Sequence, residues 1–175
     1  MLTKGDIEHG LELLSERLAH MGVVGELLLC GGAVMCLVFN ARDATKDVDA
    51  IFEPSAEMRS AAAHVAKELG WPTDWLNDAA KGYFSPRLNK TEVRSWPNLR
   101  VYAPTPDYML AMKCMAARFD SSDQDDVLFL VKFLALEAPD EVFDLIEDFY
   151  PRNLIPPKTK FFIEELMEKV GQGQG

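Results

Sequence analysis

Residues 27–37 read LLLCGGAVMCL, and residues 46–52 read KDVDAIF. The first stretch joins an aliphatic run of strand length to a glycine pair and then to a short apolar helix over residues 33–39. The second stretch alternates acidic with apolar side chains, which is typical of a strand with one buried face. Two such strands joined through a glycine turn predict a small mixed sheet with flanking helices.

The remaining chain is mostly helical in pattern. Apolar residues at three- and four-residue steps predict a helix over residues 3–21, capped by Thr3 and ended by Gly22. Residues 71–98 are rich in Trp and Pro and are expected to be irregular, with strand fragments near 74–77 and 99–102. Further helices are expected over residues 55–69, 106–118, 122–136, 139–149 and 159–170.

This order of elements predicts an α/β (α+β) fold. Residues 1–104 should form the core with the sheet, residues 105–170 a C-terminal helical bundle, and residues 171–175 a flexible tail. The 175 residues, with 48% hydrophobic and 26% charged, have the composition of a globular protein.

Charge and cysteine content exclude several classes of protein. There are 28 acidic and 18 basic residues, which gives a net charge of −10. This charge excludes a generally basic surface that would bind nucleic acid or anionic lipid without discrimination. Cys30, Cys36 and Cys114 lack C-x-x-C spacing and are expected to be buried reduced thiols. No signal-peptide pattern or membrane-span pattern is seen, so we expect a cytoplasmic protein without a membrane partner.

Asp47 and Asp49 are the first candidate site residues. On a strand they would face the same side, with Cα atoms about 6.5–7 Å apart, a spacing at which two carboxylates can share a divalent cation. Asp is disfavoured inside strands, so the pair calls for an explanation. The alternative is an edge strand with a solvated acidic face.

Gly31 and Gly32 are the second candidate feature. Two glycines let the backbone approach a ligand closely, and the free N–H groups of a helix start can hold phosphate oxygens. The alternative is a tight turn that needs a positive φ. A phosphate-binding turn next to a metal-binding Asp pair would form a single site for a metal–nucleotide complex. Phosphoryl and nucleotidyl transfer require such a site.

These residues resemble a known family. Strand, Gly31-Gly32 and helix, followed by Arg-x-x-Thr-x-Asp-x-Asp over residues 42–49, are similar to the nucleotidyltransferase superfamily of the polymerase-beta type. Within it, the chain most resembles small bacterial proteins related to AbiEii-type toxins. A second segment, residues 104–118 with Lys113, followed by Asp123, Asp125 and Asp126, is similar to that group's Leu/Met-rich helix and its Arg…Asp-x-x-Asp motif. The resemblance covers roughly residues 20–135.

The resemblance implies roles for these residues. Asp47 and Asp49 would hold Mg²⁺ or Mn²⁺. The NTP substrate would be bound by Gly31, Gly32, Arg42 and Thr45. A departure from the family pattern is Ala33, which stands where many members carry a Ser whose hydroxyl contacts phosphate.

The family's third carboxylate, the expected base for the attacking hydroxyl, has no clear motif here. Asp78 is the first candidate and Asp74 the second, and both would face the same side of a strand through residues 74–78. Glu92 is the third candidate.

Lys113 lies in a helix that is apolar all round and is therefore expected to be buried. Its ammonium could support a phosphate or an Asp of the metal site. The alternatives are a snorkelling side chain and a structural pair with Asp125 or Asp126.

The sequence thus predicts a metal-dependent nucleotidyltransferase that moves a nucleotide from an NTP to an acceptor hydroxyl. By resemblance, the acceptor would be tRNA or a protein, in a toxin-like role with an antitoxin-type partner. A local basic patch that would suit RNA comprises Lys81, Arg87, Lys90, Arg94 and Arg100. The rivals are a catalytically incomplete interaction protein of the same fold and a small-molecule, antibiotic-type nucleotidyltransferase.

Overall fold

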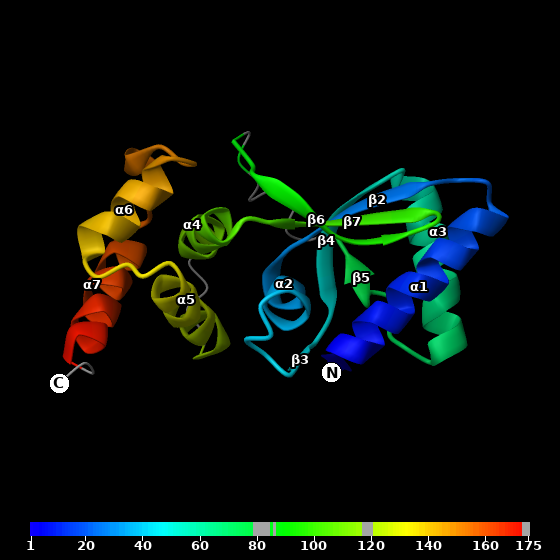
Figure 1. Cartoon of the computed structure of the whole chain (residues 1–175), viewed down its shortest axis with the longest axis horizontal. Coiled ribbons are helices and arrows are strands. Elements are labelled where there is room, and N and C mark those ends of the chain that lie inside the picture. The colour runs from blue at the N-terminus through cyan, green and yellow to red at the C-terminus, as the bar shows by residue number, and fades with distance from the viewer. Residues whose placement is uncertain (79–84, 86, 117–120, 173–175) are drawn as a thin grey trace. The chain divides into compact units, whose positions relative to one another are not determined.

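The computed structural model describes residues 1–78, 85, 87–116 and 121–172. The chain divides into two compact units (Figure 1). Unit 1 comprises Met1–Gly82 and Lys90–Pro104, and unit 2 comprises Tyr83–Asn89 and Thr105–Gly175. The described residues Ser85 and Arg87–Asn89 therefore belong to unit 2, although the domain scheme drawn from the sequence put them with the core.

Unit 1 contains a mixed sheet, which confirms the α/β fold class. Its five strands lie in the order β5-β4-β2-β7-β6. β4 and β2 are antiparallel, β2 and β7 parallel, β4 and β5 parallel, and β6 and β7 antiparallel. The strands are β2 (Gly25–Leu29), β4 (Val48–Glu53), β5 (Leu76–Asn77), β6 (Lys90–Trp96) and β7 (Leu99–Pro104). A separate two-stranded sheet pairs β1 (Leu2–Thr3) with β3 (Ala44–Thr45).

Two helices, α1 (Lys4–His20) and α3 (Ser55–Leu69), cover one face of the five-stranded sheet (Figure 1). A Cβ placed on Gly25 would meet Met58 Sδ of α3 at 2.5 Å and Leu18 Cδ1 of α1 at 2.9 Å, so glycine allows both helices to approach β2 closely. The apolar stripe of α1 is fully buried, as its periodicity predicted, through Ile7, Leu11, Leu14 and Leu18.

The tryptophans before β5 extend this core. Trp71 and Trp75 pack edge to face with ring centroids 5.3 Å apart, and Trp75 Nε1 donates to the carbonyl of Ala62 in α3. A Cβ on Gly10 of α1 would lie 2.8 Å from Trp71. These two rings therefore form a small core against α1 and α3.

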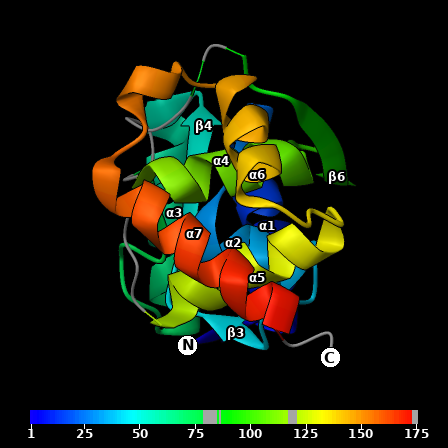
Figure 2. The same ribbon diagram turned by 90° about the vertical axis from the view of Figure 1, so that its left-hand side faces the viewer.

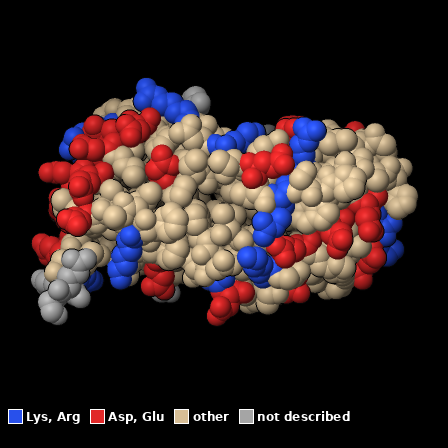
Figure 3. Space-filling model, in the orientation of Figure 1, with Lys and Arg blue, Asp and Glu red and all other residues tan. Residues whose placement is uncertain are grey.

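Unit 2 is helical, as predicted. Its helices are α4 (Pro106–Ala116), α5 (Ser121–Phe133), α6 (Pro139–Glu147) and α7 (Pro157–Gln172), with a 3₁₀ turn at Arg152–Leu154. α4 packs against α5 and α6, and α6 packs against α7 (Figure 2). Acidic side chains gather over α6 (Figure 3), which carries Asp140, Glu141, Asp144 and Glu147. Among the helices of the described residues, none has the length and apolar character to cross a membrane.

Candidate functional site

Gly31 and Gly32 are the first two residues of α2 (Gly31–Leu37), so this helix begins two residues earlier than the range of 33–39 expected from the sequence, and only Cys30 separates it from β2. Cys30 is extended and Gly31 has φ +58°, a left-handed conformation that L side chains rarely adopt. A Cβ on Gly31 would lie 3.0 Å from Asp49 Oδ2 of β4. The structure therefore brings the turn and one of the two predicted carboxylates into direct contact.

Gly32 is enclosed by protein side chains. A Cβ at this position would lie 2.5 Å from Thr45 Oγ1 and 3.3 Å from Arg42 Nη1. Gly32, Arg42 and Thr45, which the family pattern groups around the nucleotide, do lie together. The close approach that Gly32 permits is an approach of Thr45, so packing alone is sufficient to require this glycine.

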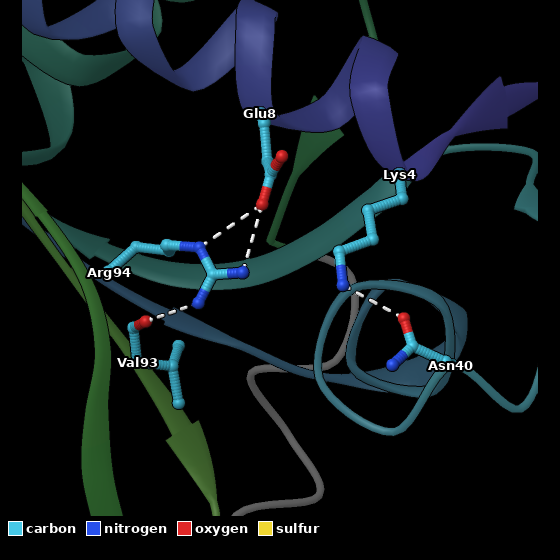
Figure 4. Close-up of polar contacts among 5 residues, drawn as sticks. All are labelled: Lys4, Glu8, Asn40, Val93 and Arg94. Atoms are coloured by element: carbon cyan, nitrogen blue, oxygen red, sulfur yellow. Dashed lines mark hydrogen bonds and ion pairs between the residues drawn. The ribbon is translucent and has the colours of Figure 1, made fainter.

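The N-terminus of the chain holds the segment that carries Arg42 and Thr45. Leu2 pairs with Thr45 across the small sheet. Lys4 Nζ donates to Asn40 Oδ1 at 2.8 Å, and Asn40 has a positive φ of 51° (Figure 4). The start of α1 thus fixes the turn that follows α2.

The two carboxylates of the Asp-x-Asp motif differ in placement. Asp49 lies in β4, and its side chain faces away from α1 and α3, because its neighbours Val48 and Ala50 are fully buried on the other face. Asp47 lies in the bend before β4, outside the strand. The alternation of faces expected over residues 46–52 therefore does not determine to which face of the sheet the Asp47 side chain points. Asp47 is half-buried and, among the described residues, forms no hydrogen bond or ion pair.

Asp78 does not join Asp49. Its Oδ2 accepts from Arg59 Nη2 of α3 at 2.6 Å, and the Arg59 guanidinium lies over the ring of Phe52, on the face that α3 covers. The residue paired with Asp49 in the parallel ladder is Asn77. The structure thus places Asp78 with α3, away from the side of the sheet that Asp49 faces.

The other candidates for a third carboxylate are Asp74 and Glu92. Asp74 is exposed in the turn before β5. Glu92 lies on β6, three strands from β4 in the sheet order, or about 14 Å across the sheet.

Lys113 is committed to an ion pair in unit 2. Its Nζ lies 2.6 Å from Asp126 Oδ2 and 3.0 Å from Asp123 Oδ1, and the Lys113 side chain is only 8% exposed. Of the readings considered from the sequence, the structure shows the structural pair with Asp126. Asp123 supplies the second contact. A role of Lys113 in phosphate binding remains a prediction.

The predicted basic patch is largely paired with other groups. Arg94 binds Glu8 Oε1 through both Nε and Nη2, at 3.1 and 2.9 Å (Figure 4). Arg100 lies 3.8 Å from Glu26, and Lys90 lies over the ring of Tyr102. Arg87 belongs to unit 2 and Lys81 lies outside the described residues. Arg94 and Arg100 are thus partly neutralised by carboxylates, whereas the contact of Lys90 with a ring leaves its positive charge in place.

The residues around Gly31 offer few ligands for Mg²⁺. Over the part of the chain that the structure describes, no group of three or more His, Cys, Asp and Glu side chains could hold a metal. Mg²⁺ is commonly bound by one or two carboxylates together with substrate phosphates, and of the two predicted carboxylates the structure brings Asp49 to the glycine turn. No protein-family model, curated protein or solved structure matches this chain.

Proposed function

We propose that this protein is a metal-dependent nucleotidyltransferase that moves a nucleotide from an NTP to an acceptor hydroxyl. The observation that supports it is the contact between the positive-φ turn at Gly31 and the carboxylate of Asp49. A ligand phosphate held by this turn would lie beside Asp49, and a divalent cation would bridge the two.

The residues of the site have distinct tasks in this proposal. Asp49 and Asp47 would hold the cation, and a bound divalent cation would supply charge neutralisation of the phosphates. The backbone of Gly31 approaches the triphosphate. Arg42 lies within reach of Gly32, where a guanidinium suits a phosphate oxygen. By resemblance, the acceptor is tRNA or a protein side chain, and an antitoxin-type protein is the partner in the cytoplasm.

A second candidate is a nucleotide-binding interaction protein of the same fold. It is favoured by the contacts of Asp78 with Arg59 and of Lys113 with Asp126, because both leave the predicted base and phosphate roles unfilled. The third candidate, transfer to a small-molecule acceptor of the antibiotic type, fits the net charge of −10.

The deciding experiment incubates the protein with labelled NTPs, Mg²⁺, and either total tRNA, cell lysate or aminoglycosides. Label transfer by the wild type, lost in Asp49→Asn, supports the enzyme and identifies its acceptor class. Asp78→Asn is the matched control, because it removes the same charge from the same sheet on the side that α3 covers. Metal-dependent NTP binding without transfer would favour the interaction protein. Equal loss in both variants, or no NTP binding, would contradict the proposed site.

A further inference from the structure

The register of β4 and β5 places Asn77 opposite Asp49. The strands are parallel, with Val48 opposite Leu76 and Asp49 opposite Asn77. Paired residues in neighbouring strands point to the same face and lie about 4.8 Å apart. Asn77 is therefore the neighbour of Asp49 on the side of the sheet that carries the candidate site.

The surroundings of Asn77 agree with this placement. Its side chain is half-buried, and Nδ2 lies 3.5 Å from the carbonyl of Asp74. Leu76 and Asp78 flank it and belong to the other side, since Leu76 is buried and Asp78 binds Arg59 of α3.

We propose that Asn77 is the third side chain of the site, occupying with a neutral amide the place where a three-carboxylate site would have its last acid. This inference rests on the proposed function and specifies how that site handles its metal. An amide offers one oxygen acceptor and two N–H donors but no charge. With Asp49, and with Asp47 as the proposed function assigns it, the site would carry a charge of −2.

Two consequences follow from the missing charge. Affinity for a divalent cation rises with the number of charged ligands, so the free protein binds the metal weakly and the nucleotide phosphates complete the coordination. An amide also cannot accept a proton from the attacking hydroxyl, so position 77 orients ligands and does not serve as general base.

The test restores the carboxylate and measures metal binding without nucleotide. Mn²⁺ is titrated calorimetrically into wild type, Asn77→Asp, and the exchanged variant Asn77→Asp with Asp78→Asn, which keeps the net charge of the wild type. Both variants should bind Mn²⁺ at least about tenfold more tightly than wild type. Adding Asp49→Asn to Asn77→Asp should remove the gain. An affinity within about twofold of wild type in both variants would overturn the proposal.

A second variant keeps the proposal testable if Asn77→Asp fails to fold. Asn77→Ser should weaken binding of Mn²⁺ with a non-hydrolysable NTP at least about threefold, because the longer amide is lost. Unchanged affinity in Asn77→Ser would count against Asn77. A gain of Mn²⁺ affinity in Asn77→Asp, with no nucleotide binding by wild type, would retain this inference and reject the proposed function.

Discussion

The ammonium of Lys113 lies 2.6 Å from Oδ2 of Asp126, and both side chains are withdrawn from water, with 8% and 2% of their surface exposed. Lys113 comes from α4 and Asp126 from α5, so the ion pair ties together two helices of unit 2. Asp123 adds a second contact at 3.0 Å. Removing one partner of such a pair strands a buried charge.

Lys113→Met should therefore destabilise the protein. The methionine fits an apolar helix, but buried Asp126 loses the ammonium of Lys113, and the free energy of unfolding should fall by about 3 kcal/mol in urea denaturation. Lys169→Met is the matched control, because the Lys169–Glu165 pair has the same 2.6 Å separation with side chains 69% and 66% exposed. That control should change stability by about 0.5 kcal/mol at most.

Asp126→Asn in the Lys113→Met background should recover part of the loss, since the stranded charge is removed. Nucleotide affinity of the folded fraction should be unchanged. An unaltered denaturation midpoint together with weakened nucleotide binding would return Lys113 to the phosphate site.

Gly32→Ala should destabilise unit 1 by about 1–3 kcal/mol, because the new methyl group would collide with Thr45 Oγ1. Thr45→Ala removes the colliding oxygen. Stability is measured by thermal unfolding of the two single variants and the double variant. Coupling between the sites should make the double variant more stable than the sum of the single changes predicts. Strict additivity would show that Gly32 is required for a reason other than Thr45.

The sequence identified the helices well because their ends carry strong local signals. Thr3 and Asp6 form a capping box that starts α1, and Gly70 ends α3 in a left-handed conformation. Pro106 and Pro139 lie at the starts of α4 and α6. Each of these signals involves only residues within about one helical turn of the helix end, so it can be recognised from the local sequence.

The errors concern relationships between strands. β6 was missed because most of its side chains are exposed or half-buried at a sheet edge, so no apolar alternation marks it. Asn77 was not considered because only carboxylates were sought for the third position, and the pairing of Asp49 with Asn77 depends on the register of a two-residue strand, where a shift of one residue exchanges the two faces. Neither feature is encoded in local periodicity. The contact of Gly31 with Asp49, by contrast, joins two motifs that the sequence had already singled out.

The three cysteines should be unreactive in the folded protein. Cys30, Cys36 and Cys114 are buried, and burial raises the pKa of the Cys114 thiol to about 12 and also raises that of Cys36. The thiolate is the reactive species, so a disulfide reagent such as DTNB at pH 8 should label none of them within minutes. Guanidinium chloride should release all three thiols. Rapid labelling of one cysteine under native conditions would show that its surroundings open to solvent.

The capping box of α1 should make stability depend on pH. Asp6 Oδ2 accepts hydrogen bonds from the hydroxyl and the N–H of Thr3 at 2.7 and 2.8 Å, and these bonds hold the pKa of Asp6 below its usual value. Because the folded-state pKa is lowered, the contribution is present above the unfolded-state pKa of about 3.9 and is lost as the pH falls through the folded-state value. Asp6→Asn should thus lower the thermal midpoint at pH 7, and the difference from wild type should shrink as the pH falls below about 4. Glu12→Gln on the same helix is the control, since Glu12 has no contact with the cap, and its difference from wild type should stay small throughout. A constant gap between Asp6→Asn and wild type at all pH values would mean that the Asp6 charge does not stabilise α1.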